Sequence, residues 1–408
     1  MKRVVITGMG IYSCLGTTLE QVTQALYSGQ SGIGIDPLRK ENGFRSALTG
    51  IVPTPDLKAV LNRHQRAFLP EEAQYAYCAT ADALRQAGMD EDYLLKHDVG
   101  LLYGNDSSAE AVIRSVDRVR AMHDTTMCGV SAIFQSMNST VTMNLGCLFH
   151  LRGINMTISA ACASGSHAIG LGAMLIRMGM QDTVVVGGAQ ETNMYAVAAF
   201  DGISAFSIRE DEPTKACRPF DKSRDGLVPS GGAATLILEE YEHAVKRGAP
   251  IIAEVLGYGF SGNGDHIANP NVDGPAQSLE RCIQDAGIDR REIGYINAHA
   301  TATQQGDASE AQAIARVFGD KTVPVTSTKS QTGHEMWMAG ASEVIYSILM
   351  MQNGFIAPNL NFETPDEHSA HLLIPSERLD RPFHTFLSNS FGFGGTNSTI
   401  IVVSPKAK

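Results

Sequence analysis

Three side chains that can carry acyl-transfer chemistry stand among small residues in this sequence, namely Cys162, His299 and His334. A cysteine thiolate can accept an acyl group from a thioester, and imidazole N–H groups can stabilise an oxyanion or an enolate. Each of these side chains lies in a short stretch of small residues, and a fourth stretch, residues 389–397 (NSFGFGGTN), is rich in glycine. Backbone N–H groups in such a glycine-rich turn can form a second oxyanion site. Together the four stretches favour thioester chemistry with a covalent acyl intermediate.

Cys162 lies where a strand is expected to turn into a helix. Residues 156–158 are apolar or β-branched and predict a buried strand, the next three residues are small, and an apolar helical pattern follows. A thiol at or just before a first helical turn faces unpaired backbone N–H groups and the positive end of the helix dipole, which favour the thiolate. The alternative interpretation is an ordinary small cysteine buried at a helix start.

Length, charge and cysteine usage narrow the class of protein. The chain of 408 residues is 43% hydrophobic and 18% charged, which is typical of a compact globular protein with a large core. A net charge of −11 argues against a general nucleic-acid binder. The 7 cysteines form no CxxC pair, so the sequence predicts neither a zinc site nor a disulfide framework, and a reducing cytoplasm is expected. No apolar run approaches the roughly 18 residues of a membrane span.

Strands and helices are expected to alternate along most of the chain, which predicts an α/β fold with a mostly parallel sheet covered by helices. The first strand is expected to end at residue 7, where Gly8-Met9-Gly10 would turn the chain. The expected strands cover residues 3–7, 99–104, 156–158, 182–188, 233–239 and 399–403, and the clearest helices cover 18–28, 71–87 and 110–120.

The chain is expected to contain two related halves, residues 1–250 and 251–408. Residues 156–179 are predicted to form a strand, a small-residue turn and a helix, and residues 323–351 repeat that order. Cys162 and His334 then fall near corresponding turns. The pattern predicts an internal duplication with a pocket where the halves meet, and shared βαβ composition is the alternative explanation.

The motifs together resemble those of an elongating β-ketoacyl-acyl carrier protein synthase, a ketosynthase of the thiolase superfamily. The resemblance covers essentially the whole length and includes RVVITGMGI at the start, the turn around Cys162, RPFDKSRDG at 218–226, both histidine stretches and SNSFGFGGTN at 388–397. It implies a five-layer αβαβα thiolase-like fold with two duplicated halves. It also implies an acyl carrier protein as partner, and either a homodimer or a heterodimer with a chain-length-factor-like paralogue.

The resemblance also implies roles for the reactive side chains. Cys162 would hold the acyl chain as a thioester, and its backbone N–H and that of Phe393 would form the oxyanion hole. Decarboxylation of a malonyl carrier would give an enolate, which His299 and His334 would stabilise through their Nε2–H groups. A Cys-His-Asn set would instead mark the initiating synthases. No metal ion is expected, and no organic cofactor beyond the carrier's phosphopantetheine arm.

Supporting roles follow from the same resemblance. Lys329 is expected to set the local electrostatics together with Glu343, and Asp307 is expected to support the site. Phe391 and Phe393 are expected to gate the pocket in a glycine-hinged loop. Taken alone, Lys329 would be interpreted as a solvated lysine and the two phenylalanines as core residues.

The sequence departs from the family pattern after each of the two histidines, and Met336 and Met338 beside Trp337 also replace small residues. Ala300 stands where glycine is usual and Ala302 where glycine or serine is usual, and the methyl group of Ala300 is expected to hinder a positive φ at that position. Trp337 also stands in place of a glycine, and its indole must fill space near the second histidine. Trp337 is therefore a candidate for shaping the acyl pocket, and an altered dimer interface is the alternative. We expect retained condensation chemistry, in fatty-acid synthesis or in a specialised polyketide or polyene pathway.

Two other functions are weighed against this one. A thiolase would need a second cysteine near the C-terminal glycine turn, and no cysteine follows Cys282. A non-elongating enzyme of the same superfamily, such as an initiating synthase, is the remaining catalytic alternative. A non-catalytic chain-length factor or scaffold would not need the cysteine and both histidines, which this chain retains.

Overall fold

The polypeptide repeats one strand arrangement twice within a single ten-stranded sheet. The computed structural model describes residues 1–405. In each half the first strand pairs antiparallel with the fifth, and the fifth antiparallel with the fourth. The fourth then pairs parallel with the second, and the second with the third. Two identical strand orders in one chain fit the predicted duplication.

The strands of the two halves meet at β1 (Val4–Tyr12) and β8 (Ala253–Gly262), which pair antiparallel over a short stretch that includes Val5 opposite Glu254. A separate small sheet pairs β2 (Ile33–Ile35) with β3 (Leu48–Gly50). The first half contains β1 (Val4–Tyr12), β4 (Gly100–Gly104), β5 (Asn155–Ile158), β6 (Thr183–Gln190) and β7 (Gly232–Glu240). The second contains β8 (Ala253–Gly262), β9 (Tyr295–Asn297), β10 (Val325–Thr326), β11 (Thr385–Gly392) and β12 (Thr396–Val403).

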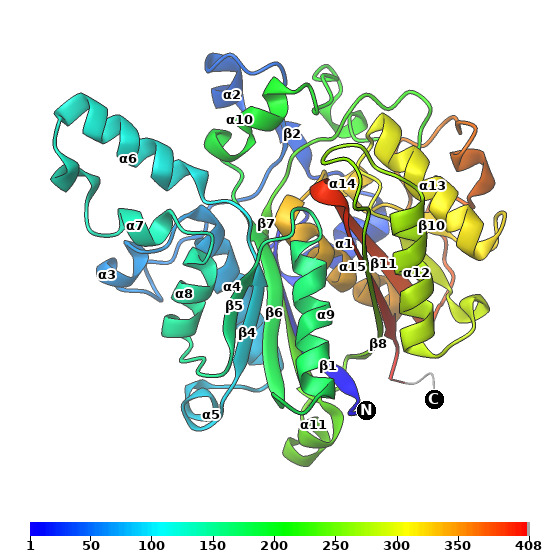
Figure 1. Cartoon of the computed structure of the whole chain (residues 1–408), viewed down its shortest axis with the longest axis horizontal. Coiled ribbons are helices and arrows are strands. Elements are labelled where there is room, and N and C mark those ends of the chain that lie inside the picture. The colour runs from blue at the N-terminus through cyan, green and yellow to red at the C-terminus, as the bar shows by residue number, and fades with distance from the viewer. Residues whose placement is uncertain (406–408) are drawn as a thin grey trace.

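Helices cover both outer faces of the sheet halves and fill the space between them (Figure 1). The middle layer shares one large apolar core with strands from both halves. The outer layers have cores of their own. The result is the five-layer αβαβα arrangement. The middle layer contains α9 (Ser164–Arg177) and α15 (Ala339–Asn353), one outer layer contains α4 (Glu71–Gln86) and α8 (Thr140–Leu148), and the other contains α12 (Asp273–Ala286) and α13 (Gln304–Phe318).

The first strand is longer than expected, because Gly8 and Gly10 continue it and do not turn the chain. A Cβ on Gly8 would lie 2.1 Å from the carbonyl oxygen of Ala83, and one on Gly10 would lie 1.9 Å from that of Ala79. Both carbonyls belong to α4. The glycines therefore let a helix pack directly onto the strand backbone, a long-range requirement that a local turn signal does not reveal.

The strand that leads to Cys162 is not the buried strand that its composition predicts. β5 lies at the edge of the sheet, paired on one side only with β4. Met156 is 51% exposed as a result. The apolar character of residues 156–158 thus marks a surface strand that remains uncovered in the single chain.

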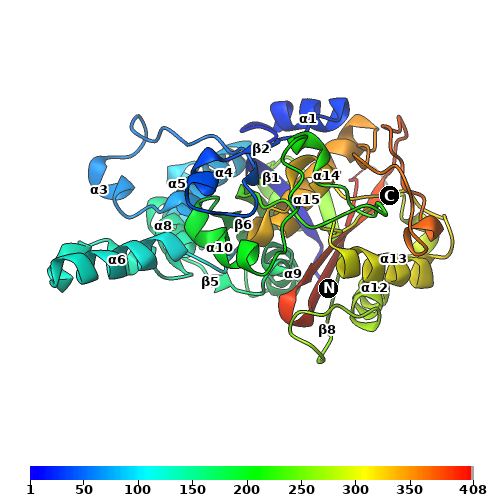
Figure 2. The same cartoon turned by 90° about the horizontal axis from the view of Figure 1, so that it is seen from above.

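The remaining expected elements lie close to their predicted bounds, since helix 71–87 is α4 and strand 99–104 is β4. The region after β4 extends away from the body of the molecule, as two views show (Figures 1 and 2). Across residues 1–405 we find no helix with the length and apolarity needed to cross a bilayer. The other helices are α1 (Leu19–Ser28), α2 (Pro37–Glu41), α3 (Arg63–Arg66), α5 (Glu91–Lys96), α6 (Ala109–Met122), α7 (Ala132–Gln135), α10 (Met194–Gly202), α11 (Tyr241–Arg247) and α14 (Lys329–Thr332).

Candidate active site

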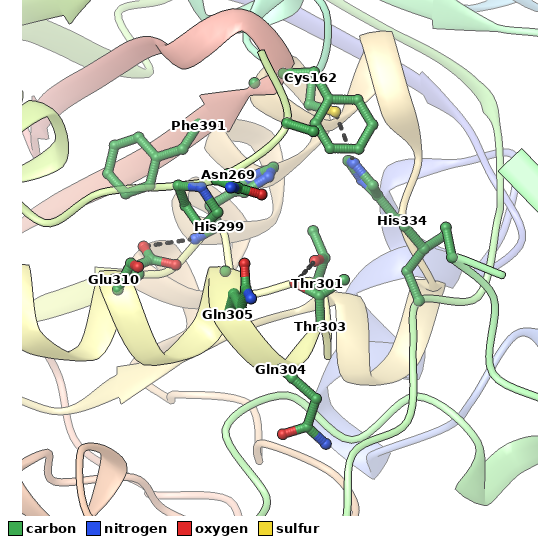
Figure 3. Close-up of a pocket in the computed structure, with 18 of the residues that line it drawn as sticks. Cys162, Asn269, His299, Thr301, Thr303, Gln304, Gln305, Glu310, His334 and Phe391 are labelled. Atoms are coloured by element: carbon green, nitrogen blue, oxygen red, sulfur yellow. Dashed lines mark hydrogen bonds between the residues drawn. The ribbon is translucent and has the colours of Figure 1, made fainter. Parts of the chain in front are cut away.

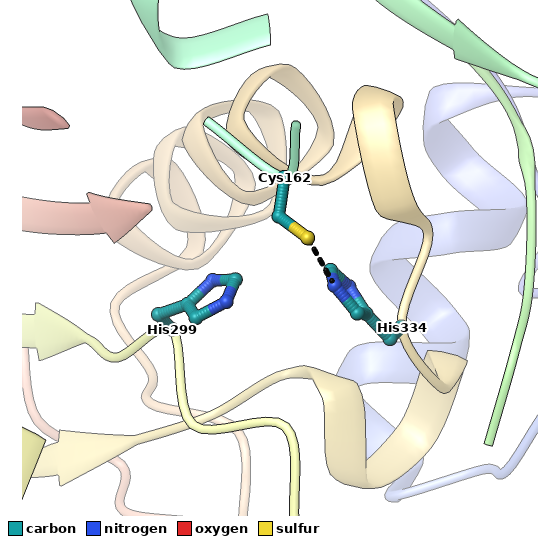
Figure 4. Close-up of side chains that lie close together, drawn as sticks. All are labelled: Cys162, His299 and His334. Atoms are coloured by element: carbon teal, nitrogen blue, oxygen red, sulfur yellow. Dashed lines mark hydrogen bonds between the residues drawn. The ribbon is translucent and has the colours of Figure 1, made fainter. Parts of the chain in front are cut away.

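The fold brings Cys162, His299 and His334 to one place, although they are far apart in the sequence (Figure 4). Cys162 follows β5, His299 follows β9, and His334 follows α14, so both halves contribute. One ligand atom from each side chain lies within 4.8 Å of the others. All three line a cavity of about 590 Å³. Such a spacing could also hold a metal ion, and the expectation of a metal-free site stays a prediction.

His334 points its ring at the sulfur. Its Nε2 lies 3.1 Å from Sγ of Cys162. The backbone N–H of Met336 donates to Nδ1 of His334 at 3.3 Å, so Nδ1 is the acceptor nitrogen. The proton of a neutral His334 therefore resides on Nε2, directed at the sulfur, which is the tautomer that the sequence analysis expected.

Burial keeps the three reactive side chains themselves uncharged at rest. Desolvation, with a smaller contribution from the nearby Lys329 ammonium, holds the pKa values of His299 and His334 well below their usual range. Desolvation also raises the pKa of the Cys162 thiol to about 12, although Lys329 and the backbone N–H groups of Cys162 and Phe393 lower it in part. The expected preference for thiolate is therefore wrong for the resting protein. Cys162 precedes α9 by two residues and is only 7% exposed, so lost hydration outweighs the helix end.

Lys329 is not a solvated lysine, because its side chain is 1% exposed and its ammonium forms an ion pair with Glu343. Burial raises the pKa of Glu343 to about 8, and Lys329 opposes that rise. Glu335, next to His334, accepts hydrogen bonds from Ser342 and Tyr346, and burial raises its pKa to about 7. Lys329 is thus a buried positive charge beside both imidazoles, as the predicted pairing with Glu343 requires.

Glu310 is a residue that the sequence analysis missed. One carboxylate oxygen accepts the backbone N–H of His299 at 2.9 Å (Figure 3). The other accepts the backbone N–H of Ala300 at 2.7 Å. Asn389 of the glycine-rich stretch also donates to it at 2.9 Å. Glu310 therefore fixes the histidine loop against β11. No spacing signal points to it, because it lies on α13 and reaches the loop only in the folded chain. Within residues 1–405, Nδ1 of His299 has no hydrogen-bond partner.

Asp307 contacts the loop that contains RPFDKSRDG. Its Oδ2 accepts the backbone N–H of Phe220 at 2.7 Å and lies 3.8 Å from the guanidinium of Arg224. Burial raises the pKa of Asp307 to about 7, against the lowering effect of Arg224. Asp307 thus joins the loop that contains RPFDKSRDG to α13, and it has no contact with Cys162 among the hydrogen bonds of the described chain.

The two phenylalanines of the glycine-rich stretch face different neighbours. Phe391 meets the ring of His299 edge-on with centroids 6.1 Å apart, and both line the cavity (Figure 3). Phe393 is 46% exposed and stacks on Phe200 of α10. Gly394 and Gly395 follow with φ of 77° and 74°, a backbone that side chains rarely adopt. This geometry suits a hinged loop at the cavity mouth, and gating itself stays a prediction.

Trp337 does not line the cavity. Its indole belongs to a buried apolar cluster that also contains Cys162, Val197 and Phe206. The indole N–H donates to the hydroxyl of Ser107 at 3.2 Å, which satisfies its one polar group. Trp337 therefore lies on the apolar side of the nucleophile, and its proposed role in the acyl pocket depends on that cluster.

The two alanines of the first histidine stretch differ in backbone conformation. Ala302 has φ of 68°, in the left-handed region, whereas Ala300 is not among the residues with positive φ. Ala300 instead donates its N–H to Glu310. The expected backbone conflict thus falls on residue 302 and not on residue 300.

This difference predicts unequal effects of glycine at the two positions. Both side chains are buried, so Ala300→Gly and Ala302→Gly each lose a packed methyl group and add freedom to the unfolded chain. Only Ala302→Gly also removes left-handed strain, so we expect it to cost about 1–2 kcal/mol less. Urea unfolding of the two variants measures the difference. Equal losses of stability would show that Ala302 is not strained.

Comparisons with known proteins decide the family. Residues 1–244 match "Beta-ketoacyl synthase, N-terminal domain" and residues 252–363 match "Beta-ketoacyl synthase, C-terminal domain". The chain belongs to the β-ketoacyl synthase family. The chain is accordingly a condensing enzyme of the acyltransferase type, and the predicted family and fold are confirmed.

Similar proteins support this membership over the full length. The 3-oxoacyl-[acyl-carrier-protein] synthase 1 of Haemophilus influenzae is 40% identical over 98% of this chain and 98% of its own. A β-ketoacyl synthase from Burkholderia phymatum STM815 has a TM-score of 0.94 at 37% identity, and both chains are covered completely at 100%. The ishigamide ketosynthase/chain length factor has a TM-score of 0.92 at 30% identity, over 99% of both chains.

Proposed function

We propose that this β-ketoacyl synthase extends an acyl chain held on Cys162 by decarboxylative condensation with a malonyl group, both delivered by acyl carrier protein. The observation that carries the proposal is the meeting of one sulfur and two neutral imidazoles in a single cavity. Membership of the family supports the reaction class. The residue roles below are inferred from the geometry.

The first step transfers the acyl group to the enzyme. The sulfur of Cys162 attacks the carbonyl carbon of the incoming thioester, a new C–S bond forms, and the carrier's C–S bond breaks. The proton of the Cys162 thiol ends on the departing pantetheine sulfur, so the exchange is balanced. Backbone N–H groups of Cys162 and Phe393 lie close enough to the sulfur to lower its pKa, and they can accept the oxyanion of the tetrahedral intermediate.

The second step forms the carbon–carbon bond. Loss of CO₂ from the malonyl thioester leaves an enolate, and N–H groups of His299 and His334 stabilise its oxygen. The enolate carbon attacks the thioester carbonyl on Cys162, the enzyme's C–S bond breaks, and the freed sulfur takes one proton from solution. Both imidazoles can donate without becoming charged, because burial keeps them neutral.

The scheme uses no metal ion and no organic cofactor held by the protein. Imidazole N–H groups do what a Lewis acid would otherwise do at the enolate oxygen. The phosphopantetheine arm arrives with the carrier as part of the substrate. We also propose a cytoplasmic enzyme, in keeping with 7 cysteines that all lack a disulfide partner.

We further propose that the surface around α6 and β5 binds a second subunit. No residue of α6 is buried, and the edge strand β5 has no partner on its outer side in the single chain. Large apolar exposure of this kind marks an interface. The second subunit is either a copy of this chain or a chain-length-factor-like paralogue. The mass in solution of this chain purified alone distinguishes them, since twice 43.7 kDa indicates a copy and a single 43.7 kDa chain indicates a paralogue. The exposed apolar residues of this surface are Val112, Ile113, Val116, Met122, Met127, Val130, Ile133, Phe134, Met137 and Met156.

Reconstitution with acyl carrier protein tests the proposed function. Enzyme mixed with an acyl carrier thioester alone should gain the acyl mass on the peptide that contains Cys162. Addition of malonyl carrier should then release CO₂ and a β-ketoacyl carrier product. Acylation of the exposed Cys147 in place of Cys162, or product formation without an acyl enzyme, would contradict the proposal.

A specialised polyene or polyketide substrate is a second candidate, favoured by the indole of Trp337 beside Cys162 in one apolar cluster. Trp337 does not itself line the cavity, but Leu227 and Met336 of the same cluster do, so its ring would favour a flat conjugated chain over a saturated one by shaping this wall. We expect wild-type enzyme to prefer polyunsaturated over saturated acyl carriers, and Trp337→Gly to reduce that preference up to about tenfold. Competition assays with paired substrates measure it. A saturated preference that is unchanged in the variant would remove this candidate.

A further inference from the structure

The residue directly before the nucleophile adopts an unfavourable backbone conformation. Ala161 has φ of 46°, in the left-handed region that alanine rarely occupies. This conformation reverses the chain between β5 and α9 and sets the position of Cys162. Such strain persists only where the surroundings hold it in place, so the groups that hold Ala161 control the nucleophile.

Both backbone polar groups of Ala161, its N–H and its carbonyl oxygen, are hydrogen-bonded. Its N–H donates to Oδ2 of Asp106 at 2.9 Å. Its carbonyl oxygen accepts the hydroxyl of Ser164 at 2.6 Å, and the same hydroxyl accepts the N–H of Ala160 at 2.9 Å. Ser164 belongs to the turn itself, whereas Asp106 comes from a different part of the chain and accepts the Ala161 N–H from outside the turn.

The sheet places Asp106 beside the turn. β4 and β5 run parallel with Gly104 opposite Ile158, so the loops that follow them lie next to each other. The N–H of Asn105 donates to the carbonyl of Ile158 at 3.2 Å, which continues the pairing by one residue. Asp106 follows directly, at the level of the turn.

The loop that carries Asp106 is itself fixed. The hydroxyl of Ser107 accepts the indole N–H of Trp337 at 3.2 Å and donates to Glu191 at 3.2 Å. Glu191 also accepts the N–H of Ala109 at 2.8 Å. Asp106 is therefore presented by a loop tied to two buried side chains, so it can hold a strained turn.

We propose that Asp106 is a positioning residue for Cys162, which acts by accepting the N–H of Ala161 and holding the nucleophile turn in its left-handed conformation. Asp106 does not touch the reacting atoms. The inference rests on the proposed function only in taking Cys162 as the nucleophile. The effect of Asp106 on the Cys162 thiol can be measured without any condensation reaction.

The carboxylate of Asp106 also bears on the charge of the sulfur. The titratable groups that act on Cys162 are Asp106 from the loop after β4, His299 from the loop after β9, Lys329 from α14 and His334 beyond it. Asp106 raises the pKa of the thiol, whereas Lys329 lowers it. The hydrogen bond of Asp106 and its charge therefore have opposite effects on reactivity, and two substitutions separate them.

Asp106→Asn keeps an oxygen that can accept the N–H of Ala161 but removes the charge. We expect iodoacetamide to alkylate Cys162 of this variant roughly three- to tenfold faster at pH 8, because the pKa of the thiol falls. Acyl transfer from an acyl carrier thioester should be at least as fast as in the wild type, because the same thiolate attacks and the turn keeps its hydrogen bond. Asp106→Ala loses both the charge and the acceptor, and acyl transfer should fall about tenfold or more.

Asp98→Asn is the matched control, since Asp98 is an exposed aspartate before β4 and should change neither rate. Equal acyl-transfer rates in Asp106→Asn and Asp106→Ala would overturn the proposal, and so would alkylation of Asp106→Asn at the wild-type rate. If Asp106→Ala does not fold, Ser164→Ala tests the hydrogen bond to the carbonyl oxygen of Ala161. This variant should slow acyl transfer and leave the pH dependence of alkylation unchanged. Acyl transfer at the wild-type rate would count against the proposal that hydrogen bonds to Ala161 position Cys162.

Discussion

Alanine in place of Cys162 is expected to lower the rate of β-ketoacyl product formation about a thousandfold or more, because no acyl enzyme can form. Release of CO₂ from malonyl carrier should continue, since His299 and His334 remain to stabilise the enolate. Product analysis by mass spectrometry, together with measurement of CO₂, separates the two steps. Loss of both activities would show that the sulfur is needed for decarboxylation as well.

Cys147→Ala provides the matched control for this variant. Cys147 is a free and exposed cysteine, and its removal should leave both product formation and CO₂ release unchanged. A comparable loss in this control would move the acyl attachment away from Cys162. Retained condensation in Cys162→Ala would contradict covalent catalysis altogether.

Methionine in place of Lys329 is expected to destabilise the protein by about 3–5 kcal/mol, because Glu343 is left as an unpaired buried acid. Both partners of this ion pair are 1% exposed, so water cannot replace the lost ammonium. The two imidazoles also lose a positive charge that lowers their pKa values. Urea unfolding measures the stability of the variant, and turnover with acyl and malonyl carriers measures its activity.

A second substitution distinguishes structure from function at Lys329. Adding Glu343→Gln to Lys329→Met removes the unpaired acid, so most of the stability should return while activity stays low. Lys215→Met tests an exposed pair with Glu212 and should change stability by less than about 1 kcal/mol. A loss below about 1 kcal/mol in Lys329→Met would show that the buried pair is not a source of stability.

Local patterns predicted the long helices, several strands and the turn around the nucleophile, because each of these is encoded by neighbouring residues. The helix 71–87 and the strand 99–104 are examples. Features that depend on distant partners were not predictable in this way. Gly8 and Gly10 were predicted to form a turn. The reason for these glycines is the close packing of α4 on the strand, which is visible only in the folded chain.

In the active site too, features that a local motif encodes were predictable, and features that depend on distant segments were not. The family motifs brought attention to Cys162, His299 and His334, and the fold places them together. Glu310 and Asp106 were missed because each acts on the backbone of another segment, and neither carries a motif of its own. The raised pKa of Cys162 was missed for a similar reason, since burial by residues from several segments cannot be read from the helix start alone.

The repeated strand order has a consequence for how the reactive groups are supported. Cys162 follows β5 and His334 follows β10 with α14, and these strands hold the same third place in their respective halves. The nucleophile and the imidazole 3.1 Å from it are therefore anchored to different halves of the sheet. Any shift of one half against the other would change this distance directly, so the continuous pairing of β1 with β8 also keeps the reactive pair in register.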